Sequence, residues 1–342
     1  MTGIVTLEEE AVVQKVVSVR PRGWIAMFML GIGAIATPVG AQNYIGRADA
    51  LLRQGQILQA EALYYYAARS EPRNAIPRLA LGRYLAARGA LRVGAVLLEE
   101  ARFFGGDRRA IAEHLAPVYA RLGDYRALSS LPNSPLVYAE RARADWLSEN
   151  VAETTGPDSV VLPLMRATAA PLGQIRVVIG ADTLTATIDV TVTGLVLDTS
   201  WATRRGVRVF RSNSDVGVRD HAGVVLSLGL GALVRSGVPA RFEAMSGPHS
   251  ARIGVDVLED FAPTWIQGPG AGSGGTIVLR KAGKAPIPSS TAERIPILIR
   301  PNDLMLVRPG GVVSSLATQA SQGSLNGRWT LDIRHGEVVI DR

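Results

Sequence analysis

The sequence contains no cysteine and only four histidines. Without cysteine the chain has no disulfide, no thiol nucleophile and no cysteine metal ligand, which fits an oxidising compartment. The histidines lie far apart and show none of the spacings of known metal motifs. We therefore expect no metal ion and no cofactor. These residues are His114, His221, His249 and His335.

Lysine is also scarce, because it occurs only at Lys15, Lys281 and Lys284. The net charge of +7 therefore comes from arginine, which is scattered along the chain without a dense run. Nucleic-acid sites gather basic residues into a stripe, so we expect no nucleic-acid partner. With 342 residues, 47% of them hydrophobic, the chain is globular and long enough for two domains.

An uncharged, apolar stretch at residues 23–41 follows an N-terminal flank, residues 1–22, that ends with two arginines. The stretch closes on Val39-Gly40-Ala41, which predicts a signal peptide cleaved after Ala41. The alternative is an uncleaved membrane anchor with the same orientation. Both place the remaining chain outside the cytoplasm, either free in the periplasm or anchored in the inner membrane and facing the periplasm.

Helical periodicity dominates residues 42–152, where similar segments recur every 34 residues. Gly55, Gly89 and Gly123 mark this period, each placed where the first helix of a pair would end. The segment resembles the tetratricopeptide repeat in its length and small-residue positions over about residues 44 to 130. A further helix, residues 136–152, is expected to cap the open end of the helical stack.

The resemblance implies a surface that binds a protein partner. Tyr64 and Tyr65 are the candidate contacts, together with Tyr66. The alternative is that these tyrosines pack between the helices.

The composition changes after a turn-rich linker at residues 153–171, and short alternating strands follow. Residues 172–284 predict an all-β sandwich or small barrel. Residues 285–342 predict a β extension that lengthens the sheet or covers its edge. The predicted fold class is therefore multidomain α + β, with a helical solenoid before an all-β barrel and its β extension.

One strand runs directly into an acid and two hydroxyls, Leu197-Asp198-Thr199-Ser200. An ordinary strand end that turns on its aspartate would have this pattern, and so would the water-activating loop of an aspartic protease. About fifty residues later, Ile253-Gly254 is followed by "VDVLEDF". In this order, the two motifs resemble the single-lobed, retropepsin-like aspartic proteases over about residues 172 to 280.

That resemblance implies Asp198, Thr199 and Ser200 as the catalytic loop, with Ile253 and Gly254 in the second loop that supports it. Two carboxylates that share one proton divide the acid and base roles of peptide hydrolysis. A one-lobed chain carries one of them, so an active form must be a homodimer acting on a protein or peptide substrate.

The motif also departs from the family, which usually has glycine at Ser200 and a small residue at Trp201. A second acid, Asp189, is interpreted as a turn or surface residue, and residues 211–223 as a candidate flap. Asp332 lacks a following hydroxyl and is not expected to supply a partner aspartate.

Two functions follow from these observations. The first is an exported aspartic endopeptidase whose repeats recruit a protein partner. The second is a catalytically inactive scaffold or docking subunit of an envelope complex. A sugar-binding or peptidoglycan-binding protein is a further form of the second.

Overall fold

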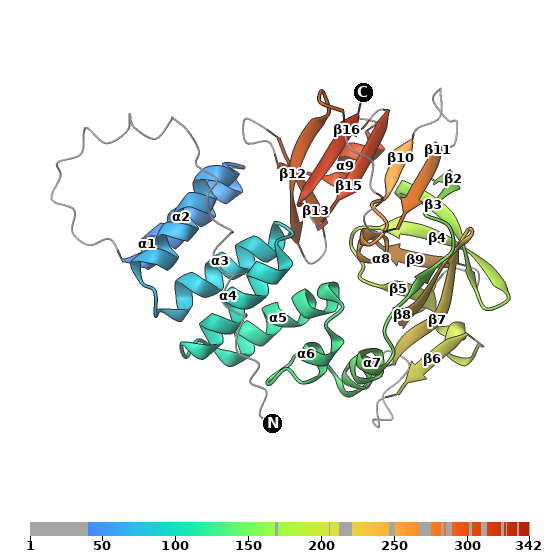
Figure 1. The fold of residues 1–342 in the computed structure, drawn as a ribbon, viewed down its shortest axis with the longest axis horizontal. Helices are drawn as coiled ribbons and strands as arrows, with labels where there is room; N and C mark the ends of the chain where they lie inside the picture. Colours follow the sequence, from blue (N-terminus) through green and yellow to red (C-terminus); the bar gives the residue numbers. More distant parts are fainter. Residues whose placement is uncertain are drawn as a thin grey trace, which may run out of the picture. The chain divides into compact units, whose positions relative to one another are not determined.

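The computed structural model describes residues 40–167, 170–204, 206–211, 221–245, 250–266, 275–281, 284, 289–300, 303–308, 313–322, 325, 327–333 and 335–341. Residues 23–39 of the predicted leader and most of the predicted flap lie outside these ranges. The described part begins with helices and continues with strands (Figure 1), so the combination of α and β regions is confirmed. The helices of the first part are α1 (Ala41–Arg53), α2 (Ile57–Ser70), α3 (Ala75–Ala87), α4 (Leu91–Phe103), α5 (Arg108–Leu122), α6 (Tyr125–Ser129) and α7 (Tyr138–Glu149).

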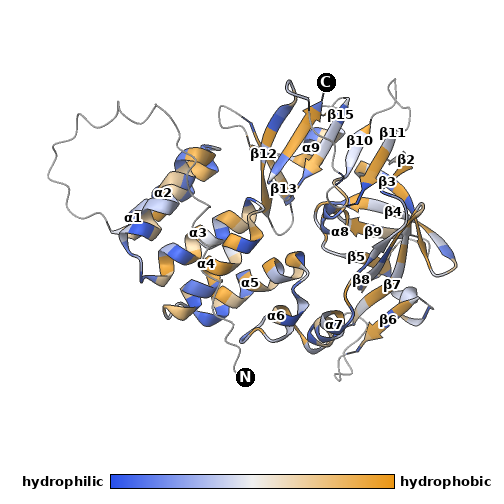
Figure 2. Ribbon diagram, in the orientation of Figure 1, coloured by the Kyte–Doolittle hydropathy of each residue, from blue (hydrophilic) through white to orange (hydrophobic). Residues whose placement is uncertain are grey.

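Helices α1 and α2 pack as one pair and α3 and α4 as the next. Gly55, Gly89 and Gly123 follow α1, α3 and α5 with φ values of +73°, +86° and +68°, a conformation that favours glycine. Hydrophobic residues alternate with hydrophilic ones along these helices (Figure 2), as expected for helices buried on one face. Each 34-residue period thus contains a helix, a glycine in the left-handed conformation and a second helix that packs on the first.

The first strands of the β region are β1 (Thr154–Thr155) and β2 (Ser159–Ala167), both inside the stretch predicted to be a linker. Val160, Leu162 and Leu164 alternate toward the hydrophobic core of the β region, and β2 pairs with β11. Only the turn residues that precede β2 have the composition of a linker, because the alternation of β2 begins immediately after them.

The remaining strands form one continuous sheet. Its order is β14-β13-β12-β16-β15-β10-β11-β2-β3-β4-β9-β5-β8-β7-β6, with β1 beside β8 and a further pairing of β3 with β7. These strands are β3 (Ala170–Ile179), β4 (Asp182–Asp189), β5 (Leu195–Asp198), β6 (Val207–Phe210), β7 (Ala222–Leu230), β8 (Leu233–Glu243), β9 (Ser250–Gly254), β10 (Thr264–Ile266), β11 (Gly275–Arg280), β12 (Glu293–Arg300), β13 (Asp303–Val307), β14 (Val313–Ser315), β15 (Arg328–Asp332) and β16 (Glu337–Asp341). Three short helices, η1 (Thr199–Thr203), α8 (Val255–Glu259) and α9 (Leu316–Ser321), connect them.

Strand β9 lies between two strands that precede it in the sequence. It pairs parallel with β4, placing Gly254 opposite Asp189, and antiparallel with β5, placing Ile253 opposite Leu195. The chain therefore leaves β4 at Asp189, loops over the end of β9 through residues 190–194, and returns along the other side of β9. We call residues 190–194 the crossing loop.

The C-terminal strands extend the sheet and also contact the helices. Trp329 of β15 stacks on Trp265 of β10 with ring centroids 4.1 Å apart, which joins the extension to the preceding β region. Leu298 and Val307 share a hydrophobic cluster with helices α1 to α3. Arg88, after α3, donates hydrogen bonds to the carbonyls of Ile297 and Gly336 at 2.6 and 3.1 Å. The residues from Gly40 onward accordingly form one unit.

None of the helices in the described residues combines the length and the hydropathy that crossing a membrane requires.

Candidate functional site

The crossing loop packs directly against Gly254. A Cβ on Gly254 would lie 2.6 Å from the carbonyl oxygen of Val192 and 3.1 Å from that of Gly194. The Gly254 amide donates to the Gly194 carbonyl at 2.8 Å. Glycine is needed here because the two backbones touch where any side chain would stand. The loop that fits closely against Gly254 is therefore the one that follows Asp189, not the one that follows Asp198.

Asp189 is held by groups of its own chain. Its Oδ1 accepts from the backbone N–H of Thr191 at 2.8 Å and from the Thr191 hydroxyl at 2.6 Å. Its Oδ2 lies 3.5 Å from Nη1 of Arg252, and Arg252 also forms an ion pair with Glu243. Arg252 belongs to β9, two residues before Gly254. The carboxylate at the start of the crossing loop thus has a cation beside it and a hydroxyl donating to it.

Asp198 caps the short helix η1. Its Oδ1 accepts from the backbone N–H of Ser200 at 2.9 Å, and its Oδ2 accepts from the N–H of Met245 at 3.0 Å. Hydrogen bonds from the side chain and backbone of Ser200, followed by that from Met245, lower the pKa of Asp198. This geometry matches the first interpretation of the motif, a strand end that turns on its aspartate.

The residues after Asp198 serve the same turn. Ser200 is exposed, Thr199 is half-buried, and the Thr203 hydroxyl donates to the Ser200 carbonyl at 3.2 Å. Trp201 is fully buried in the β core, with the Arg204 guanidinium 4.6 Å from its ring centre. The bulky residue that departs from the family pattern is therefore a core residue that anchors η1.

The two predicted supporting residues, Ile253 and Gly254, lie together on β9. Ile253 is buried in the β core, where its neighbours across the sheet are Ile188 and Leu195. Gly254 contacts the crossing loop. The structure brings these two residues together with Asp189 and separates their contacts from the cap at Asp198.

The three consecutive tyrosines of α2 divide between core and surface. Tyr64 is 3% exposed, donates to Asp49 and packs on Tyr84 with ring centroids 5.1 Å apart. Tyr65 is 42% exposed and Tyr66 53% exposed. Tyr65, Tyr66, Ala62, Arg69 and Ser70 line a cavity of about 490 Å³ on this helix. Tyr65 is therefore available to a partner, whereas Tyr64 is part of the helical core.

The sequence predicts Asp189 as a turn or surface residue, in keeping with its hydrogen bonds to Thr191, but it gives no role to Arg252 or Asp256 of the same crossing. Asp256 receives the Gly194 amide on both carboxylate oxygens, at 3.0 and 2.8 Å, and so holds the end of the crossing loop. The sequence does mark Asp189 as the end of a strand, because Leu184, Ala186 and Ile188 alternate inward up to it and a polar loop follows. Nothing in the sequence itself places β9 beside that strand.

Among the described residues, no group of three or more histidine and acidic side chains is arranged to hold a metal ion.

No protein-family model matches the chain, and no curated protein matches it. Among solved structures, a weak neighbour is a retropepsin-like aspartic protease from Rickettsia conorii. The two chains are 11% identical with a TM-score of 0.24, and the alignment covers 38% of this chain and 95% of that one. A likeness of this size adds nothing to the contacts described above, so the interpretation of the site depends on those contacts.

Proposed function

We propose that the chain is a docking protein in which a retropepsin-like β domain without hydrolytic activity is joined to tetratricopeptide-like repeats. One observation carries this proposal: both aspartates that could serve catalysis are committed to partners within the chain. Asp198 accepts from two backbone amides, and Asp189 accepts from Thr191 and pairs with Arg252.

The chemistry of the aspartic mechanism explains why these partners matter. Two carboxylates share a proton because neighbouring negative charges repel each other. A guanidinium beside Asp189 offsets that repulsion. Val190 and Thr191 follow Asp189, where the family motif has a hydroxyl residue and then a small residue. The crossing loop packs against Gly254, but it lacks the groups that would divide the acid and base roles of hydrolysis.

The docking surface we propose is formed by Tyr65, Tyr66 and the neighbouring Arg69 on α2. Exposed tyrosines bury a large area with few rotamers to order, which favours binding of a protein partner. Residues 23–41 favour export, so we place this docking outside the cytoplasm, in the periplasm or at the inner membrane.

Purified residues 40–342 should leave unfolded casein intact between about pH 4 and pH 7, the range in which a carboxylate pair shares its proton. Intact mass spectrometry after long incubation, with an active aspartic protease as positive control, makes this measurement. Cleavage that persists after purification and disappears in Asp198→Asn would show that the cap residue is catalytic and would overturn the proposal.

Tyr65→Ala should reduce capture of the native partner in proximity labelling and leave the melting temperature nearly unchanged. The matched variant Tyr64→Ala should lower the free energy of unfolding by about 3 kcal/mol, since it removes a buried ring. If Tyr65→Ala captures the same proteins as the wild type, the α2 surface is not the docking site.

A second candidate function, peptide hydrolysis through Asp189, is favoured by the packing of the crossing loop on Gly254. It requires a symmetric dimer that brings two copies of Asp189 together. Casein cleavage lost in Asp189→Asn and retained in Asp198→Asn would establish this function in place of the first.

A further inference from the structure

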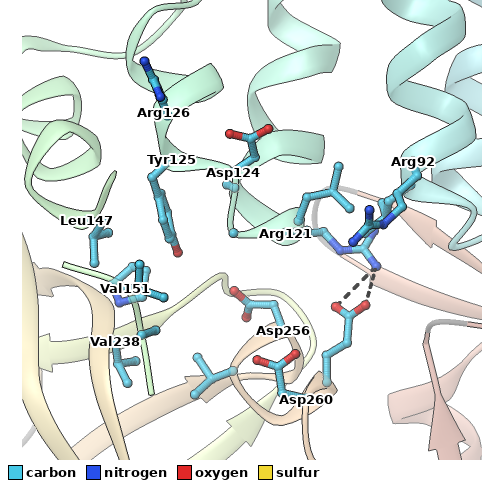
Figure 3. Close-up of a pocket in the computed structure, with 18 of the residues that line it drawn as sticks. Arg92, Arg121, Asp124, Tyr125, Arg126, Leu147, Val151, Val238, Asp256 and Asp260 are labelled. Atoms are coloured by element: carbon cyan, nitrogen blue, oxygen red, sulfur yellow. Dashed lines mark hydrogen bonds and ion pairs between the residues drawn. The ribbon is translucent and has the colours of Figure 1, made fainter. Parts of the chain in front are cut away.

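A cavity of about 700 Å³ lies where the turn between α5 and α6 faces α8 and β8. Figure 3 shows Leu147, Val151 and Val238 together on the left of the cavity, with Asp256, Asp260 and Arg121 to their right. The cavity touches neither the Asp198 cap nor the tyrosines of α2. It is therefore separate from both of these places.

Two ion pairs in the wall of the cavity are formed within the chain. Arg121 pairs with Glu259 at 3.4 Å, and Arg235 pairs with Asp260. Asp256 is different, because its carboxylate accepts only backbone amides and no cationic side chain among the described residues pairs with it. A carboxylate that is taken out of water without a cation is unfavourable until one is supplied.

The Tyr125 hydroxyl points toward the Asp256 carboxylate across the cavity (Figure 3). No described residue forms a hydrogen bond with this hydroxyl, so it remains available to accept from a ligand. The carboxylate and the hydroxyl form a polar end beside the apolar wall of Leu147, Val151 and Val238. A cation on an aliphatic stem matches both parts of this surface.

We propose that this cavity binds an alkylammonium or alkylguanidinium group, with its cationic head at Asp256 and Tyr125 and its stem on the apolar wall. Two sources carry this chemistry: a small free amine, or a lysine or arginine side chain of a peptide. The proposed cation site does not depend on whether the docking partner is the source of the cation.

Binding at this site is linked to the crossing loop through Asp256. Both oxygens of this carboxylate accept the Gly194 amide, and its Oδ1 lies 2.2 Å from where a Cβ of Gly254 would stand. A cation that stabilises the ionised carboxylate also strengthens its hydrogen bond to Gly194. Occupancy of the cavity therefore stabilises the crossing loop where Gly194 donates to Asp256.

The affinity should depend on pH with a defined sign. Burial raises the pKa of Asp256, against the lowering effects of the backbone amides and of Arg121. The other titratable groups that line the cavity come from each element around it: Arg92, Asp124, Tyr125, Arg126, Arg235, Glu259 and Asp260, with Arg143 of α7 acting on Tyr125. Only the ionised carboxylate attracts a cation, so affinity rises as pH rises through the raised pKa of Asp256 and falls below it.

The test is titration of residues 40–342 with n-butylammonium and n-butylguanidinium, followed by calorimetry and thermal shift. n-Butanol and pentanoate serve as neutral and anionic controls, and a lysine-containing tripeptide distinguishes the peptide source from the free amine. We expect saturable binding of the cations, about tenfold weaker in Asp256→Asn because a charged hydrogen bond is lost. Asparagine keeps an acceptor for Gly194 and removes an unfavourably buried charge, so this variant should fold. The Gly194 amide resonance should shift on saturation in the wild type only.

Each alternative outcome overturns the proposal. Equal affinity of the wild type and Asp256→Asn would mean that Asp256 does not bind the cation. Equal binding of n-butanol would mean an apolar cavity only, and preferential binding of pentanoate would assign the site to Arg92 and Arg121 instead. Absence of cation binding up to about 100 mM would mean that the cavity has no such function.

Discussion

Replacing Gly254 by alanine should lower the free energy of unfolding by on the order of 3 kcal/mol, because no space exists for the added methyl group. The methyl carbon would stand 2.2 Å from Oδ1 of Asp256 and 2.6 Å from the carbonyl oxygen of Val192. The Asp256 side chain could rotate away only by releasing the Gly194 amide. Chemical denaturation of the purified variant measures the loss.

The matched control is Gly46→Ala on α1, where nothing lies within 4 Å of the new Cβ. The free energy of unfolding of this variant should rise by about 0.5 kcal/mol, since alanine is the better helix former. Equal stability of Gly254→Ala and the wild type would mean that the crossing loop does not pack against β9.

Gly89→Ala should lower the free energy of unfolding by about as much as Gly254→Ala, for a different reason. Gly89 has φ +86°, and its Cβ would lie 2.2 Å from the carbonyl oxygen of Ile333. The positive φ alone costs about 1 kcal/mol, and the collision with a backbone atom adds to it. Because Gly89 follows α3 and Ile333 follows β15, the loss would show that repeats and C-terminal extension unfold together.

Gly123→Ala separates the two contributions to this loss. Gly123 occupies the same place in the next repeat with φ +68°, and nothing lies within 4 Å of its Cβ. This variant should lose only the conformational cost of about 1 kcal/mol. Equal losses in the two alanine variants would mean that the helices do not depend on the extension.

The helical part of the fold was predictable because each repeat carries its own signals. The 34-residue spacing of Gly55, Gly89 and Gly123 and the small residues between them act within a few turns of one helix pair. The alternation of β strands could be identified for the same reason. Strand pairing could not, since the placement of β9 between β4 and β5 depends on contacts more than fifty residues apart in the chain.

The candidate site shows the same limit. The pattern at Leu197 to Ser200 fits both a catalytic loop and a capped strand end, because an aspartate before a serine serves either. Contacts decide between them: Asp198 receives the Met245 amide from beyond β8, and Gly254 meets the loop after Asp189. Trp201 departs from the family motif, and its size is explained by its position, since η1 places its side chain in the hydrophobic core.

The stability of Asp198→Ala shows whether Asp198 acts as a structural cap. At neutral pH, this variant should lose about 1 kcal/mol of unfolding free energy, with a smaller loss in Asp198→Asn, which keeps one acceptor. The folded pKa of Asp198 is lowered, so the cap contributes above the unfolded pKa and is lost as pH falls through the folded value. The wild type and the alanine variant should therefore converge in acid. An alanine variant as stable as the wild type at neutral pH, or more stable, would contradict the role of Asp198 as a cap.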